Sequence, residues 1–343
     1  MKSETDIIRE IEASFLCYRD TKDSIGADTL ERKWAQLTRN EPSRFINNDG
    51  TVNVDAMRNF RKRFIFVPDD PVFNPAWWNI KNVGGGRRGT VRLLKDSLQV
   101  LIQDGYTRLL EKYPCFPVGA PFVFKHRGYA FTHRWNRHIY LVGLLNKVMG
   151  NLIKDEFITL DIGSSYGIFS HILKNEFPNT HCILMDFPEQ LLLAHYFIAM
   201  NNPHARIASF KEVFAENQLG KDFFRKYDYI LVPISRYLQI TAASIDMVTN
   251  FVSFAEMNRH WFEYYMNNEP FTSARFFFTM NRFVSAPEYD SDITILDYHL
   301  EKFSKLHFGI CRLFGYAYKR KWLFSYRRRS LSSQFFEFIG ERR

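Results

Sequence analysis

The sequence predicts an α/β protein with a doubly wound, Rossmann-like sheet behind a mainly helical N-terminal cap. After Gly150, short β-rich apolar runs alternate with helical segments, which is typical of a parallel sheet covered on both faces. The first of these runs ends in a glycine-containing turn that leads directly into a helix, as in nucleotide-binding folds. A chain of 343 residues, 46% of them hydrophobic, can bury the core that such a fold requires.

The cap is expected to comprise residues 1–125. Apolar residues recur at helical spacing over 3–21 and again over 91–110. Between these segments, residues 40–89 are rich in Asn, Pro and Gly, which excludes long regular elements and favours loops. Residues 126–343 then form the doubly wound domain, which ends in a basic C-terminal segment.

The elements of the second domain are predicted in order along the chain. Strands are expected at 157–162, 182–185, 229–232, 247–249 and 275–280. Helices are expected at 133–149, 168–175, 189–200 and 256–266. Two late β-rich pieces, 307–313 and 334–339, are expected to close the edge of the sheet.

Most of the positive charge lies near the C-terminus. The chain has a formal net charge of +9, and residues 316–343 hold eight basic side chains against Glu337 and Glu341. Two basic triplets, 319–321 and 327–329, bracket the apolar residues Trp322, Leu323, Phe324 and Tyr326. This segment is expected to contact a phosphorylated acceptor or the surface of a membrane, unless it is a core-filling strand with solvated ends.

Targeting and metal signals are both missing from the pattern. No apolar run reaches the ~18 residues that cross a bilayer, and the first residues lack an apolar signal region, so we expect a cytoplasmic protein. The four cysteines are far apart, which argues against a disulfide framework or a zinc ribbon. The scattered histidines show no metal-ligand spacing, so no metal is expected.

Three chemistries compete for the turn Gly163-Ser-Ser-Tyr-Gly167. A nicotinamide-dinucleotide site requires G-x-G-x-x-G, which would place glycine where Ile168 stands. A serine-hydrolase elbow requires G-x-S-x-G, which makes Ser165 the nucleophile. Its triad would need Asp297 with His299 or His307. That reading leaves Asp161 unexplained, and no oxyanion motif lies upstream.

The third interpretation uses more of the residues. Asp161-x-Gly163-x-Ser165-x-Gly167 is similar to the first motif of class I S-adenosylmethionine-dependent methyltransferases, with serine at the middle glycine. Asp186 follows at the end of the next predicted strand, where an acid accepts hydrogen bonds from ribose hydroxyls.

Three further segments extend the similarity. Leu184-Met-Asp-Phe-Pro-Glu189, Asn250-Phe-Val-Ser-Phe-Ala-Glu-Met257 and Arg275-Phe-Phe-Phe-Thr-Met-Asn-Arg282 resemble motifs of the sugar O-methyltransferase family. The resemblance covers about residues 130–285 and implies a methyltransferase sheet, S-adenosyl-L-methionine as cofactor, and O-methylation of a sugar, glycan precursor or related polar metabolite.

The resemblance also implies roles for individual residues. The residues expected to bind the cofactor are Asp161, Gly163, Ser164, Ser165, Gly167, Asp186, Phe187, Asn250 and Phe251. Glu256 is the first candidate for the general base, and His260, one helical turn further on, would share its helix face. The residues expected to hold the polar or phosphorylated acceptor are Arg134, Arg137, Asn281 and Arg282. Each of these also has a structural reading, such as a first-turn acid for Glu256.

Two alternatives remain for the function. One is a methyltransferase with another acceptor, including RNA, although the N/D-P-P-Y/F block of adenine-methylating enzymes is missing after the fourth strand. The other is a non-catalytic binding or scaffold protein, because Ser165 and Val252 depart from the family pattern. The sequence does not predict an oligomeric state.

Overall fold

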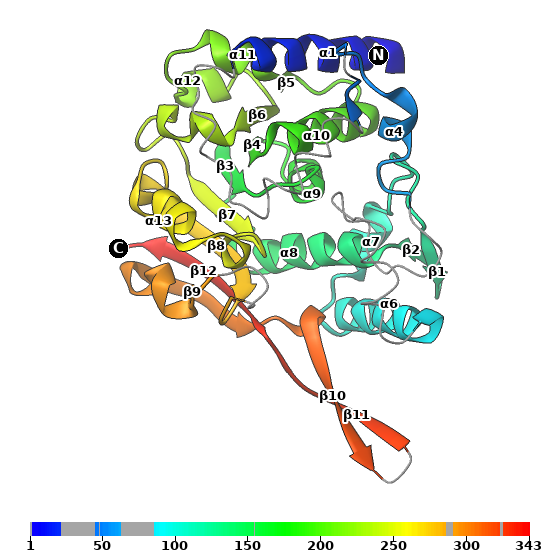
Figure 1. Ribbon diagram of the computed structural model, residues 1–343. Coiled ribbons are helices and arrows are strands. Elements are labelled where there is room, and N and C mark those ends of the chain that lie inside the picture. Colours follow the sequence, from blue (N-terminus) through cyan, green and yellow to red (C-terminus); the bar gives the residue numbers. More distant parts are fainter. Residues whose placement is uncertain are drawn as a thin grey trace.

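The computed structural model describes residues 2–21, 45–47, 49–62, 86–153, 155–285, 291–322 and 325–343. A central sheet of eight strands runs through the molecule, with helices on both of its faces (Figure 1). In spatial order the strands are β5 (Ile207–Ala208), β6 (Tyr229–Pro233), β4 (Thr180–Asp186), β3 (Phe157–Ile162), β7 (Met247–Phe251), β8 (Phe276–Arg282), β12 (Phe335–Arg342) and β9 (Phe303–Ile310). All neighbours are parallel except β12, which is antiparallel to both β8 and β9.

Helices of the described segments cover both faces of this sheet. The α-helices are α1 (Glu4–Thr21), α4 (Val54–Arg58), α6 (Gly86–Gln103), α7 (Thr107–Lys112), α8 (His133–Met149), α9 (Ile168–Glu176), α10 (Pro188–Asn201), α11 (Phe210–Ala215), α12 (Lys221–Phe224) and α13 (Arg259–Asn267). The short 3-10 helices are η3 (Ile234–Gln239), η4 (Phe254–Glu256), η5 (Phe271–Ser273), η7 (Ile295–Tyr298), η8 (Leu300–Lys302) and η9 (Arg312–Phe314). Among the described helices, none is both long and apolar enough to span a bilayer.

Two hydrophobic clusters lie against the sheet. One packs α8, α9 and α10 against it and also takes in Ile11 of α1 and Leu98 of α6. The other lies beneath α12 and α13, with Phe223 and Phe262 among its members. The N-terminal helices therefore share a core with the sheet, and the proposed boundary between residues 125 and 126 stays a prediction.

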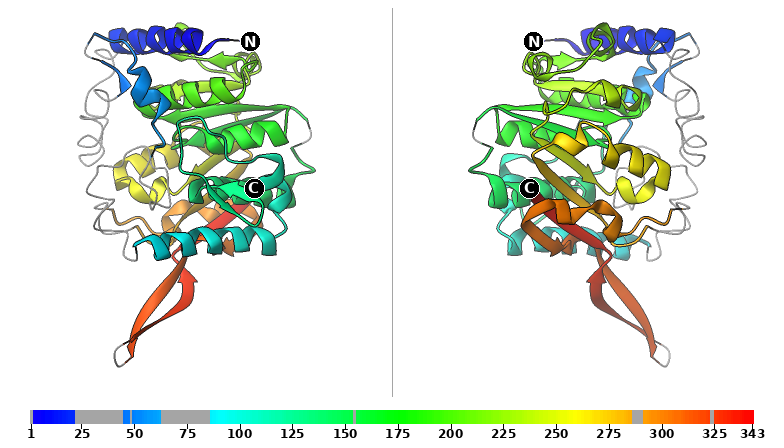
Figure 2. Two further views of the ribbon diagram at one scale, coloured as in Figure 1. Left: turned by 90° about the vertical axis from the view of Figure 1, so that its right-hand side faces the viewer. Right: turned by 90° about the vertical axis from the view of Figure 1, so that its left-hand side faces the viewer.

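Two pairs of strands form separate small sheets. β1 (Phe124–His126) pairs with β2 (Tyr129–Phe131). β10 (Gly315–Trp322) pairs with β11 (Ser325–Ser333) in an antiparallel hairpin that extends away from the body of the protein (Figures 1 and 2). The basic segment is therefore not a strand of the central sheet. Leu323 and Phe324, between the two strands, lie outside the described residues.

The doubly wound α/β fold is confirmed, and two helix boundaries differ from expectation. The helical segment at 91–110 is two helices, α6 and α7, which are separated at Gly105, a glycine with a left-handed φ of 77°. The helix expected at 256–266 begins at Arg259, because Asn258 caps it by accepting a hydrogen bond from the backbone N–H of Trp261 at 3.0 Å.

Candidate functional site

The order of the strands determines where a ligand can bind. β3 lies inside the sheet, with β4 on one side and β7 on the other, so the direction in which strands are added reverses there. In open α/β sheets, ligands bind outside the carboxyl ends of the strands at such a switch point. The turn after β3, Asp186 at the end of β4, and Asn250 near the end of β7 all lie at this edge.

The turn after β3 has a backbone that needs small residues. Gly163 and Gly167 have φ values of 76° and 83°, in the left-handed region. A Cβ at Gly163 would lie 2.3 Å from the Oγ of Ser253, and one at Gly167 would lie 2.7 Å from Leu184 Cδ2. Ser165 also has a left-handed φ, 52°, which is uncommon for a residue other than glycine. The turn is thus packed tightly between β7 and β4.

Asp186 connects the end of β4 to this turn. Its Oδ2 accepts a hydrogen bond from the Ser165 backbone N–H at 2.6 Å, and its Oδ1 accepts one from the Phe187 N–H at 2.7 Å. Burial raises the pKa of Asp186 to about 6, although these two hydrogen bonds lower it. Each carboxylate oxygen can accept a further hydrogen bond, so a ligand hydroxyl can still bind here.

Asp161, in β3, is a second carboxylate of the same edge and is more deeply buried than the half-buried Asp186. It is 3% exposed, and its Oδ1 accepts a hydrogen bond from Thr249 Oγ1 at 2.8 Å. Burial, and then the nearby charge of Asp186, raise the pKa of Asp161 to about 7. Among the described residues, no basic side chain contributes to the pKa of either aspartate. The site therefore presents a buried acid, Asp161, and a half-buried acid, Asp186, and in the described chain no basic side chain lowers the pKa of either.

Buried polar atoms without partners accompany these acids. In the described part of the chain, neither Ser164 Oγ nor Gln190 Nε2 has a hydrogen-bond partner, and both residues are buried. Ser165 Oγ lies between Arg134 Nη1, 3.3 Å away, and Gln190 Oε1, 3.4 Å away. Since buried polar groups normally find a partner, this cluster has the character of a site for a polar ligand.

Asn250 and Asn281 form a buried amide network across β7 and β8. Asn250 donates to the Ile162 carbonyl at 2.8 Å and accepts from the Phe254 N–H at 2.9 Å and from Asn281 Nδ2 at 2.8 Å. Asn281 Oδ1 accepts from the Ala255 N–H at 3.2 Å. Both side chains are fully buried, so the network holds η4 against the strand ends. A direct contact of Asn281 with substrate stays a prediction.

The two catalytic candidates lie on different elements. Glu256 is half-buried and ends η4, whereas His260 is exposed in the first turn of α13. Met257 and Asn258, between them, have extended backbones with ψ values of 156° and 163°. The expectation that Glu256 and His260 share one helix face is therefore wrong, because the cap at Asn258 starts a new helix.

The loop that carries Glu256 begins with an unusual backbone. Val252, directly after β7, has a φ of 71°. A β-branched residue in the left-handed region is a true outlier, which costs about 1–3 kcal/mol. Both non-glycine departures from the family pattern, Ser165 and Val252, thus lie in strained conformations after adjacent strands.

The remaining predicted site residues lie at varied distances from the turn. Phe187 precedes α10, while the ring of Phe251 packs in the core, 4.7 Å from Phe169 and 4.8 Å from Phe278 between ring centres. Arg134 reaches the turn through Ser165, and Arg137 lies one helical turn further along α8. Arg282, at the end of β8, donates to Gln334 Oε1 at 3.1 Å.

The hydrolase triad is not assembled. Asp297 forms an ion pair with Arg259 at 3.0 Å, and His299 Nδ1 lies 3.6 Å from Glu301 Oε1. His307 is in β9, not beside the turn after β3, and its Nε2 lies 3.0 Å from Glu337 Oε1. The partners of Ser165 Oγ in the described chain are Arg134 and Gln190, and neither is a general base for a serine nucleophile.

The sequence did not single out several residues of this site. Thr249 supports Asp161, and Gln190 contacts Ser165, although both lie within or next to motifs that were used. Tyr166 of the turn is fully buried beneath Arg61 of the N-terminal region, whose guanidinium carbon lies 5.5 Å from the ring centre. No local pattern predicts that long-range contact. The described residues contain no group of three or more His, Cys, Asp or Glu side chains that could hold a metal.

Comparisons with known proteins give distant structural similarities. No protein-family model and no curated protein sequence matches the chain. The magnesium protoporphyrin IX methyltransferase of Synechocystis PCC 6803, solved with bound SAH, is 10% identical, with a TM-score of 0.36 over 62% of this chain and 84% of that one. The precorrin-6y C5,15-methyltransferase of Geobacter metallireducens GS-15 is 14% identical, with a TM-score of 0.31 over 57% of this chain and 87% of that one.

A third similar structure is the methyltransferase domain of bacterial CtHen1. It is 12% identical, with a TM-score of 0.35 over 60% of this chain and 99% of that one. Scores this low carry no argument for the function, so the function has to be inferred from the residues and geometry of the site.

Proposed function

We propose that this protein is an S-adenosylmethionine-dependent O-methyltransferase that acts in the cytoplasm on a hydroxyl of a sugar, glycan precursor or related polar metabolite. The observation that supports it most is the pair of acids at the switch point, buried Asp161 and half-buried Asp186, whose pKa values no basic side chain of the described chain lowers. A donor that carries both a sulfonium and an ammonium group supplies the missing positive charge, and its ribose supplies hydroxyls for Asp186.

The residues at the edge of the sheet suit the two halves of such a donor. Asp186 is placed for the ribose because each of its oxygens has used one hydrogen bond on the backbone and keeps capacity for another. The glycine turn and Asp161 are placed for the methionine half. Ser164 Oγ and Gln190 Nε2, which lack partners among the described residues, add a hydroxyl and an amide for its polar groups.

When bound, the donor supplies an electrophilic methyl group on sulfur, so the protein has little bond chemistry to perform. Its residues must hold an acceptor hydroxyl in line with that methyl group and remove the hydroxyl proton. Glu256 is our candidate for the base because the Asn250–Asn281 network fixes η4 beside the donor site. Arg134, Arg137 and Arg282 are our candidates for holding polar or phosphorylated parts of the acceptor.

The test is methyl transfer by the purified protein to a panel of sugars, sugar nucleotides and other polar hydroxyl compounds. Mass spectrometry should detect a methylated acceptor and the demethylated donor in equal amounts. Glu256→Gln should lower turnover by about 10²–10⁴-fold and leave donor affinity unchanged. The matched control is Glu263→Gln, at an exposed position on α13 that is seven residues further along the chain.

Each outcome of this assay has a clear meaning. Transfer to RNA alone would replace the sugar acceptor with a nucleic acid. Donor binding without transfer to any acceptor would identify a non-catalytic binding protein. Full activity in Glu256→Gln would remove Glu256 from the role of base.

A further inference from the structure

The hairpin of β10 and β11 is separate from the carboxyl edge of the sheet, which carries the candidate site. The proposed function does not use this hairpin. Its strands form a two-stranded sheet of their own, which extends beyond the body of the protein in Figure 1 and in both views of Figure 2, each turned by 90° from Figure 1. In sequence, residues 315–333 contain six basic residues and no acidic residue. An isolated two-stranded hairpin has little stability of its own, so we expect a partner to stabilise it.

The strand register places like charges opposite one another. Lys319 pairs with Arg328, and Arg320 pairs with Arg327. Directly opposed like charges destabilise a pair of strands, unless an anionic surface neutralises them. We call these four residues, with Lys321 and Arg329, the basic collar.

The aromatic end of the hairpin is formed by Trp322, which lies beyond the collar, and by Tyr326, which lies level with the last collar residue, Lys321. Lys321 pairs with Tyr326, and Trp322 pairs with Ser325 at the last described position. At about 3.3 Å per residue, Trp322 lies ~10 Å beyond Lys319 along the strand. The order along the ribbon is therefore body, basic collar and aromatic end.

We propose that this hairpin docks the protein onto an anionic lipid bilayer. Trp and Tyr favour the level of the headgroups, and basic residues just behind them meet anionic phosphates and carboxylates. The pair of Lys319 and Arg328 lies ~10 Å behind Trp322, which is comparable to the depth of about 5–10 Å that interfacial segments reach. The open edges of the hairpin cannot enter hydrocarbon, so insertion is shallow.

A nucleic-acid groove fits the same hairpin less well. A two-stranded ribbon fits the major groove of DNA, but phosphates line that groove along its whole length. Here the last pair with a basic residue is Lys321 with Tyr326, and the uncharged pair of Trp322 with Ser325 lies beyond it. Binding to RNA or DNA is therefore kept as an outcome that would overturn the proposal.

Sedimentation with lipid vesicles tests the proposal without any methyl transfer, so its failure is independent of the proposed function. The probe is vesicles of phosphatidylcholine with roughly 30 mol% phosphatidylserine, compared with phosphatidylcholine alone. We expect binding to the anionic vesicles only, and release as salt shortens the Debye length. Replacing all six collar residues with Gln should lower partitioning at least a hundredfold, since each is worth about fivefold near the surface.

A charge-matched variant controls for net charge. It replaces six exposed lysines elsewhere with Gln: Lys95, Lys125, Lys147, Lys211, Lys226 and Lys302. This variant should keep at least a tenth of wild-type binding. Trp322→Ser, with the collar intact, should bind the anionic vesicles about tenfold more weakly, because the aromatic end no longer inserts.

Several results would overturn the proposal. One is equal losses in the collar variant and the lysine control, which would mean that only net charge matters. Another is a folded collar variant that binds anionic vesicles like wild type at low salt. A third is collar-dependent binding to an RNA or DNA duplex with no binding to vesicles. A variant in which a short Gly-Ser linker replaces residues 316–332 provides the same test if the collar variant does not fold.

Discussion

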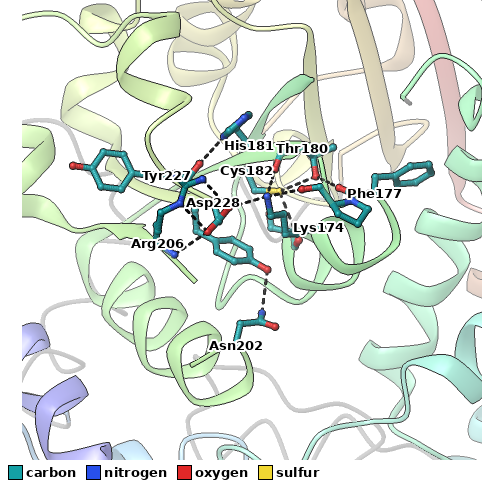
Figure 3. Close-up of polar contacts among 12 residues, drawn as sticks. Lys174, Phe177, Thr180, His181, Cys182, Asn202, Arg206, Tyr227 and Asp228 are labelled. Carbon is teal, nitrogen blue, oxygen red and sulfur yellow. Dashed lines mark hydrogen bonds and ion pairs between the residues drawn. The ribbon is translucent and has the colours of Figure 1, made fainter. Parts of the chain in front are cut away.

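Carboxylates at the two ends of the parallel sheet have opposite electrostatic environments. At the amino end, Asp228 lies before β6 and is surrounded by donors (Figure 3). It contacts Lys174 Nζ at 3.0 Å, the Arg206 backbone N–H at 2.9 Å and Arg206 Nη2 at 3.3 Å. Burial would raise the pKa of Asp228, but the hydrogen bonds from Arg206 and Lys174 lower it to about 2.

At the carboxyl end, Asp161 is more deeply buried and Asp186 is half-buried, and in the described chain no basic side chain lowers the pKa of either. Burial raises their pKa values to about 7 and about 6. One end of the sheet thus holds a carboxylate that stabilises the fold, while the other holds carboxylates that cost stability when ionised. Strained or unsatisfied groups that persist in a fold are characteristic of functional sites, so the carboxyl end is where we expect a ligand.

The largest expected effect is at Asp161. Its folded pKa is above the unfolded value, so its contribution to stability is present at acid pH and is lost as the pH rises through about 7. Asp161→Asn removes the buried charge. The free energy of unfolding of the variant minus that of wild type should therefore be about 2–4 kcal/mol higher at pH 8 than at pH 4. Urea denaturation at both pH values measures this difference. A pH-independent difference would show that Asp161 is not titrating near neutrality.

Asp228 should give the opposite sign. Its folded pKa is below the unfolded value, so its contribution is present above about pH 4 and is lost as the pH falls through about 2. Because the group is partly solvated, Asp228→Asn should cost about 1–2 kcal/mol at pH 7 and less at pH 3. Asp222→Asn, at a side chain that is 96% exposed, is the control that should change little. A stabilised Asp228→Asn would break the comparison between the two ends.

The smallest effect concerns backbone strain at the carboxyl end. Glycine is normally less stable than alanine in a strand, but Val252 has a φ of 71°, which glycine adopts without strain. Val252→Gly should therefore be more stable than Val252→Ala by about 1 kcal/mol. At Val248, within β7, the order should reverse. If alanine is the more stable residue at both positions, Val252 stores no strain. Thermal unfolding of the four variants decides this.

The sequence predicts the strands of the doubly wound sheet well because short apolar runs bounded by turns are local signals. β3 matches its predicted range, and the residues at the ends of β3 and β4 fall where the motifs place them. The insertion of β12 between β8 and β9 depends on pairing between distant segments, which no local pattern encodes. For the same reason the hairpin of β10 and β11 was not predicted, although its charges were.

The candidate site was predictable only in part. Asp161 and Asp186 are acidic residues within recognisable motifs, so the sequence predicts where they lie. Their raised pKa values depend on burial that the fold creates. The helix expected to carry Glu256 depended on periodicity alone, and the cap at Asn258 ends that periodicity. The hydrogen bond between the amides of Asn250 and Asn281 joins two strands and has no local signal in the sequence, while their contacts with cofactor and substrate stay predictions.

The central claim is that the carboxyl end of the sheet binds S-adenosylmethionine through the ribose contact at Asp186. Calorimetric titration of the donor into wild type and Asp186→Ala tests it most directly, with Asp222→Ala as the control at an exposed acid. We expect wild type and the control to bind alike and Asp186→Ala to bind about 10–150-fold more weakly, as expected for hydrogen bonds to a charged group. Unchanged affinity in folded Asp186→Ala, or wild-type binding of a nicotinamide dinucleotide in place of the donor, would contradict the claim.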